Sequence, residues 1–175
     1  MAVKLSKLLF VILLFSNLSC AVNAKDFEVS RSEIISHAKE KVNHSQKELD
    51  ETIAKCRDNL PFIEKQKINN YDLSNEELFT ALFYLSDKAI TECEKITWGS
   101  YIFELSVLRS IEKHYSSPVT KTTDHEKLLL NNYWRKIKLE LEYLNIDQPK
   151  RALIENDDLF KKPFDAVMTA KKLGI

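Results

Sequence analysis

Five side chains near the start of the chain have the types and spacing to bind a metal ion. Glu33, His37, Glu40, His44 and Glu48 recur every three or four residues, so on a helix they fall within about 80° of one another. Carboxylates and imidazoles in this arrangement can bind zinc or copper. The same spacing also suits ordinary i, i+4 pairing on a solvated face. Because the stripe lies opposite the apolar side of the helix, we expect a solvated face without a cofactor. The metal candidates are Glu33, His37 and His44.

Cys56 and Cys93 are a second candidate set. They are the only cysteines besides Cys20, which lies in the N-terminal segment. Two cysteines in an exported chain most simply form a disulfide; buried free thiols are the alternative. They do not form a C-x-x-C motif and neither has a histidine nearby in sequence, so a catalytic role is not expected.

Other chemistry has little support. His114 and His125 flank a loop over residues 116–123, but histidines near helix ends are more often caps or surface residues. Adjacent acids such as Asp157 and Asp158 point in different directions on a helix. Gly99 and Gly174 are the only glycines, which excludes glycine-rich phosphate loops, dinucleotide fingerprints and the G-x-S-x-G elbow. The sequence therefore predicts a protein that is not an enzyme.

The first 24 residues have the layout of a secretory signal peptide. Lys4 and Lys7 precede an unbroken apolar run over residues 8–15, and small residues end at Ala24. The run is too short to cross a bilayer, which takes about 20 residues, so no stable membrane insertion is expected after cleavage. Lipidation at Cys20 is the alternative to cleavage after Ala24, and an uncleaved N-terminal helix is a third possibility. We expect a periplasmic or secreted protein.

Charge and composition limit the partners. The chain has 26 basic and 26 acidic side chains and is 44% apolar, enough for a core. Removal of residues 1–24 takes away two lysines and no acids, leaving a charge of −2. Such a chain has no net field to attract nucleic acid. The expected partner is another protein.

The remaining residues, 25–175, read as one all-α domain, a bundle of four to six helices. Ser30 with Glu33, Ser74 with Glu77 and Thr123 with Glu126 have capping-box spacing. They predict helices from 30 to about 59, from 74 through at least 93, and from 123 to 144. The apolar rhythm continues across Gly99, so residues 75–115 are either one kinked helix or two. Short helices are expected over 150–160 and 164–173.

The disulfide and the apolar periodicity give two structural expectations. Cys93 lies about 27 Å along its helix from Ser74, so we expect the connector to run back along the first helix and the two helices to be parallel. The helix over 123–144 carries Leu130, Trp134, Ile137, Leu141 and Leu144 on one side, opposite Lys127, Asn131, Lys138 and Glu142. The aromatic residues are expected to be mostly core.

Trp98 and Tyr101 are the expected exceptions: at a break near Gly99 they would form a protein-contact surface at the end of the bundle. The function that these patterns favour is a non-catalytic, exported protein-binding or accessory factor of the cell envelope, of an inhibitor, immunity or assembly type. A helical bundle that binds a metal or small ligand, and an enzyme without recognisable motifs, remain alternatives.

Overall fold

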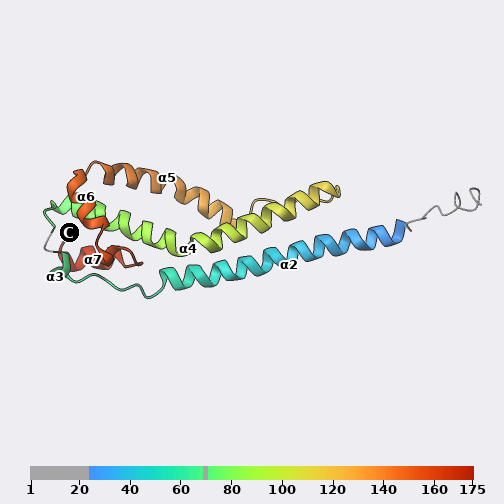
Figure 1. Ribbon diagram of the computed structural model, residues 1–175, viewed down its shortest axis with the longest axis horizontal. Helices are drawn as coiled ribbons and strands as arrows, with labels where there is room; N and C mark the ends of the chain where they lie inside the picture. The colour runs from blue at the N-terminus through green and yellow to red at the C-terminus, as the bar shows by residue number, and fades with distance from the viewer. Residues whose placement is uncertain (1–23, 69–70) are drawn as a thin grey trace, which may run out of the picture. The chain divides into compact units, whose positions relative to one another are not determined.

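The computed structural model describes residues 24–68 and 71–175 (Figure 1). They form six α-helices, one 3-10 helix and no strand, which confirms the all-α bundle with one disulfide. The elements are α2 (Ala24–Arg57), α3 (Lys65–Ile68), α4 (Asn75–His114), α5 (Asp124–Leu144), α6 (Gln148–Glu155), η1 (Asp158–Phe160) and α7 (Ala166–Leu173). The signal-peptide and Cys20 predictions fall almost entirely on residues 1–23, outside the described residues.

The chain divides into two units, residues 1–37 and 38–175. Of the first unit the structure describes the opening part of α2. The second unit contains both hydrophobic clusters, the disulfide, helix α5 and the clefts beside it.

Two of the three predicted capping boxes are formed. The Ser74 hydroxyl accepts from the Glu77 amide, and the Glu77 carboxylate accepts from the Ser74 amide; Thr123 and Glu126 do the same for α5. The third prediction is wrong, because Ser30 lies inside α2. Residues 24–29 contain no glycine or proline, so nothing in them ends the helix before Ser30.

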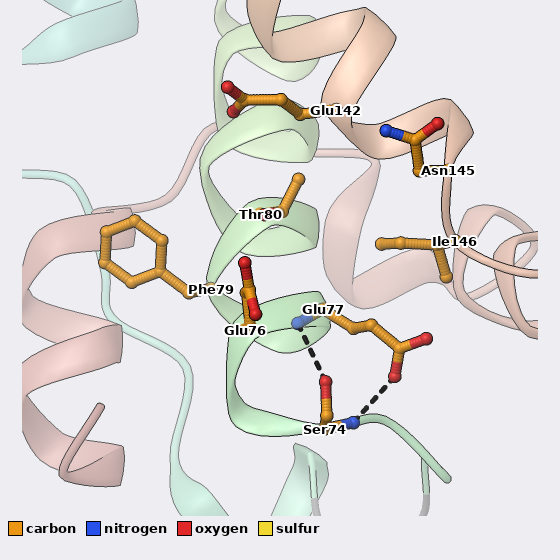
Figure 2. Close-up of a pocket in the computed structure, with 8 residues that line it drawn as sticks. All are labelled: Ser74, Glu76, Glu77, Phe79, Thr80, Glu142, Asn145 and Ile146. Carbon is orange, nitrogen blue, oxygen red and sulfur yellow. Dashed lines mark hydrogen bonds between the residues drawn. The ribbon is translucent and has the colours of Figure 1, made fainter.

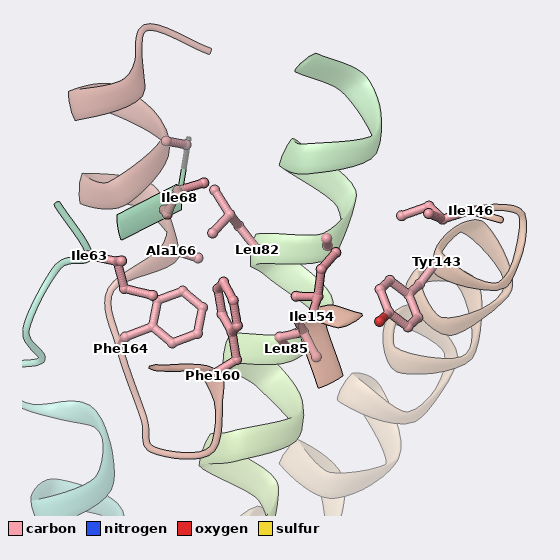
Figure 3. Close-up of a cluster of buried hydrophobic side chains, with 12 residues drawn as sticks. Ile63, Ile68, Leu82, Leu85, Tyr143, Ile146, Ile154, Phe160, Phe164 and Ala166 are labelled. Atoms are coloured by element: carbon pink, nitrogen blue, oxygen red, sulfur yellow. The ribbon is translucent and has the colours of Figure 1, made fainter. Parts of the chain in front are cut away.

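Helix α4 is continuous across Gly99, which settles whether residues 75–115 form one helix or two. It contributes buried side chains along its whole length, as expected for the central helix. Its first half supplies Leu82 and Leu85 to a cluster shared with α3, α6, η1, α7 and the end of α5 (Figure 3). Its second half supplies a cluster shared with α2, made of Ala38, Val42, Leu49, Tyr101, Leu105 and Leu108.

Cys56 and Cys93 form the predicted disulfide, with their Cα atoms 6.1 Å apart. The predicted parallel arrangement is wrong. Ala38 and Val42, near the middle of α2, lie in one cluster with Leu105 and Leu108, late in α4, whereas Cys56, at the end of α2, bonds Cys93 in the middle of α4; the two helices are therefore antiparallel. The described parts of the connector, residues 58–68 and 71–74, lie beyond the end of α2, and α4 then runs back along it (Figure 1). The distance of about 27 Å from Ser74 to Cys93 sets how far the connector must extend from Cys56, but it does not set the direction.

Candidate protein-binding surface

One side of α5 is an apolar surface turned to solvent. We call it the α5 stripe and define it by Leu130, Tyr133, Trp134, Ile137, Leu141 and Leu144. All six lie within about 100° around the helix. Trp134 is 73% exposed, Leu130 64% and Leu141 60%; Ile137 is half-buried. The expectation that the aromatic residues are mostly core is therefore wrong for Tyr133 and Trp134, whereas Tyr143 of the same helix is buried.

The opposite side of α5 packs on α4 (Figure 1). The ring of Tyr143 stacks on Tyr84 with centroids 4.2 Å apart. The Lys136 ammonium donates to the Thr91 hydroxyl at 2.6 Å and lies 3.7 Å from the Asp87 carboxylate. The long side chains on this side thus cover α4, and the α5 stripe is left outside.

Polar anchors at the start of α5 fix its rotation. The Arg109 guanidinium, on α4, donates to both Glu126 carboxylate oxygens at 2.7 and 2.8 Å and to two backbone carbonyls of the preceding loop. These hydrogen bonds lower the pKa of Glu126 to about 2. The Tyr101 hydroxyl bonds the Thr123 hydroxyl at 2.8 Å. With both ends of α5 held, its apolar side cannot turn inward.

A buried carboxylate holds the loop before α5. Glu112, 2% exposed, accepts from the Thr120 amide at 2.6 Å and from the Thr120 hydroxyl at 2.9 Å. These bonds satisfy a charge that would otherwise be costly to bury. The loop over 115–123 is thereby tied back onto α4, which sets where α5 begins.

The α5 stripe has the spacing of a helix–helix seam. Its central members, Leu130, Trp134, Ile137, Leu141 and Leu144, are separated by four, three, four and three residues. This is the heptad pattern by which side chains of one helix interlock with those of another. The positions that border the seam are exposed and mostly uncharged: Asn131, Tyr133, Lys138, Glu140 and Asn145.

Two clefts adjoin the packed side of α5. The first, of about 450 Å³, is lined by Glu76, Glu77, Phe79 and Glu142 among others (Figure 2). Its carboxylates are partly engaged, since Glu77 caps α4 and lies 3.5 Å from the Lys150 ammonium, and Glu142 lies 3.8 Å from Lys138. The cleft offers a polar, acidic surface with one exposed ring.

The second cleft, also about 450 Å³, lies where α4, α5 and α7 meet. Its charged groups largely pair with residues of the chain: Asp87 lies 3.4 Å from Arg135 and 3.7 Å from Lys136. Arg57 donates to both oxygens of the buried Glu94 at 2.5 and 2.9 Å, which raises the Arg57 pKa. The charged side chains of this cleft thus form ion pairs between helices.

The surface expected at Trp98 and Tyr101 is not formed in the way the sequence suggested. The helix does not break at Gly99, Tyr101 is fully buried, and Trp98 is half-buried with its indole donating to Glu94 at 3.2 Å. His125 packs against both rings and bonds Asp50 at 2.7 Å. The ring of the other loop histidine, His114, contacts Tyr115 instead.

The predicted metal candidates lie on α2. His44 is exposed and lies 3.3 Å from Glu48, as the i, i+4 spacing predicts. Glu33 and His37 belong to the first unit of the chain. In residues 24–68 and 71–175, no group of three or more histidine, cysteine or acidic side chains is arranged to hold a metal ion.

The sequence predicted five of the six α5 stripe residues as one side of the helix, without Tyr133, but the expectation that the aromatic residues are mostly core was wrong for Tyr133 and Trp134. A signal for the exposure of the stripe was present: strict four–three alternation is typical of a seam between separate helices. What the sequence could not supply was the set of anchors that rotate α5.

None of the helices described is long and apolar enough to span a bilayer. The disulfide is compatible with an oxidising, exported location. Comparison with protein-family models, curated proteins and solved structures finds no match.

Proposed function

We propose that this is an exported, non-catalytic protein that acts by binding other protein surfaces, as an accessory factor of the cell envelope of an inhibitor, immunity or assembly type. The α5 stripe is its docking surface. The exposure of Trp134, Leu130 and Leu141 at seam spacing on one helix is the observation that carries the proposal.

The size of the α5 stripe supports the proposal that it is a docking surface. The α5 stripe spans about 21 Å of helix and exposes on the order of 600 Å² of apolar side chain, the upper end of the largest patch on a typical monomer. Its aromatic members are of the types that dominate binding energy at interfaces. Leaving them in water has no benefit for the folded chain itself, so a partner surface accounts for their position.

The export part of the proposal depends on the N-terminal segment and the cysteine pair. Cleavage after Ala24 would give a chain that begins at Lys25 and whose two remaining cysteines, Cys56 and Cys93, are paired. N-terminal sequencing of the protein recovered from envelope or medium should read from Lys25. Recovery of the intact chain from the cytosol with free thiols would contradict export.

The binding part is tested by affinity capture from native envelope extract. Wild type, Trp134→Glu and Leu141→Glu are compared with Ile96→Glu, which removes an 85%-exposed apolar residue from α4 outside the α5 stripe. The two stripe variants should lose a specific protein contact that Ile96→Glu retains. Association that is unchanged in both stripe variants, whether with extract proteins or between copies of the chain, would remove the proposal.

A further inference from the structure

We infer that the occupant of the α5 stripe is a second copy of this chain, docked with its own α5 antiparallel to the first. The inference rests on the proposed function in one respect, namely that the α5 stripe is a docking surface. It adds the identity and the geometry of the occupant.

The apolar area of the α5 stripe is large enough for contact with a second copy. About 600 Å² of apolar surface from each copy gives a total of about 1,200 Å² buried, the lower end of the range for specific interfaces. The α5 stripe alone therefore meets the requirement of a modest dimer when it is matched by an equal apolar surface. The same stripe on a second chain is such a surface.

The charges around the α5 stripe also suit a second copy. The seam's borders carry one lysine, Lys138, and one glutamate, Glu140, so they have no net charge to select a strongly basic or acidic partner. The chain without residues 1–24 is also close to balanced, with 24 basic and 26 acidic side chains. A second copy therefore meets little long-range repulsion, and proteins near zero net charge associate readily.

Two α5 helices can also pair in a register that matches their side chains. In an antiparallel pair with its twofold axis between residues 135 and 136, Trp134 faces Ile137 of the second copy and Leu130 faces Leu141. Leu144, at the end of each stripe, faces the aliphatic part of Lys127. Equivalent border positions then meet: Tyr133 lies near Glu140 of the second copy, and Lys138 near Asn131. The phenol can donate to the carboxylate, and no like charges are opposed.

Sliding the pair by one heptad in one direction would bring Lys138 opposite Lys138 of the second copy and Glu140 opposite Glu140, and both contacts are repulsive. Sliding it by one heptad in the other direction leaves Ile137, Leu141 and Leu144 without an apolar residue opposite them. Both alternative registers are therefore disfavoured. The sequence of α5 thus favours one symmetric arrangement, which is the isologous contact expected of a twofold dimer.

Sedimentation equilibrium of the exported chain, with its disulfide intact, tests the inference. Wild type should be a reversible dimer at micromolar concentrations. Trp134→Glu and Leu141→Glu should each weaken dimerisation at least about tenfold, whereas Ile96→Glu should not. Because the replaced side chains are exposed, circular dichroism and thermal unfolding should show that all three variants remain folded.

Cross-linking tests the geometry. In a mixture of Tyr133→Cys and Glu140→Cys chains, a short bis-maleimide should join the two variants to each other. A mixture of Tyr133→Cys and Lys138→Cys is the control, since those positions meet only in a parallel pair. Preferential cross-linking of the control mixture would overturn the antiparallel arrangement.

Two further outcomes would overturn the inference. The first is a monomer at all concentrations, and the second is a dimer that Ile96→Glu weakens while both stripe variants leave it intact. If the chain is monomeric but the α5 stripe still captures another protein, the inference fails and the proposed function stands. If the chain is monomeric and the stripe variants lose no contact, both fail.

Discussion

At the scale of single residues, the buried carboxylates of Glu94 and Glu112 and the half-buried carboxylate of Glu126 determine how the helices meet. Glu94, Glu112 and Glu126 each accept two or more hydrogen bonds from groups on other segments or from the next turn of their own helix. A carboxylate removed from water is stable only with such partners. Replacing one of these carboxylates should therefore lower the free energy of unfolding more than replacing an exposed acid does.

The acid sensitivity of the fold should reflect Glu126. Its pKa of about 2 lies below the usual 4.5, chiefly because Arg109 hydrogen-bonds its charged form. A lowered folded-state pKa adds stability that is fully present above pH 4.5 and is lost as pH falls towards 2. The contribution is on the order of 3 kcal/mol.

We therefore expect Glu126→Gln to lower the free energy of unfolding at pH 7. The difference in this free energy between wild type and variant should shrink to near zero as the pH falls from 4.5 to 2. Urea unfolding across this range measures it. Glu92→Gln, at an exposed carboxylate that pairs with Lys95, is the control and should change little. A gap between wild type and Glu126→Gln that does not vary with pH would contradict the assignment.

Glu94 gives a second prediction at this scale. Its side chain is 3% exposed and holds the guanidinium of Arg57, which is itself 39% exposed. Glu94→Gln should lower the free energy of unfolding by about 2 kcal/mol, less than for a fully buried pair because water already screens Arg57. Chemical denaturation measures the change. A loss no greater than that of Glu92→Gln would show that the pair is not stabilising.

At the scale of helices, α5 shows that one helix can be apolar on its exposed side. Its inward side is built from long polar and aromatic residues, such as Lys136 and Tyr143, that contact α4. The expectation that the apolar side faces the core assumed that burial alone sets the rotation. Here the anchors at the start of the helix set it.

The continuity of α4 gives a prediction about Gly99. A methyl group added there would meet no atom within 4 Å, and alanine reduces the backbone entropy lost on helix formation. Gly99→Ala should therefore raise the free energy of unfolding by about 0.5–1 kcal/mol. Thermal unfolding followed by circular dichroism measures the shift.

Gly174 is the matched comparison. It caps α7 with φ of 81°, a conformation that favours glycine. Gly174→Ala should lower stability by about 1 kcal/mol. If Gly99→Ala also destabilised the protein, a continuous, unstrained helix at that position would be ruled out.

At the scale of the whole molecule, the disulfide joins α2 to the middle of α4 across 37 residues of sequence. Closing a loop of that length limits the unfolded chain and should stabilise the fold by about 4 kcal/mol. Cys56→Ser with Cys93→Ser should lose this amount in urea unfolding. Reduced wild type should match the double variant. Equal stability of the oxidised and reduced proteins would contradict a stabilising bridge.

The sequence by itself predicted the all-α class, the positions of the main helices, two of the three predicted caps, the cysteine pair and five of the six residues of the α5 stripe. The helices, the caps and the stripe depend on neighbours within a few residues, and the cysteine pair follows from the small number of cysteines in the chain. Tertiary structure alone decided the antiparallel return of α4, because chain length fixes how far a connector reaches and not its direction. It also decided that the α5 stripe faces outward, because contacts between distant residues, such as Arg109 with Glu126 and Tyr84 with Tyr143, set the rotation of a helix that periodicity leaves free.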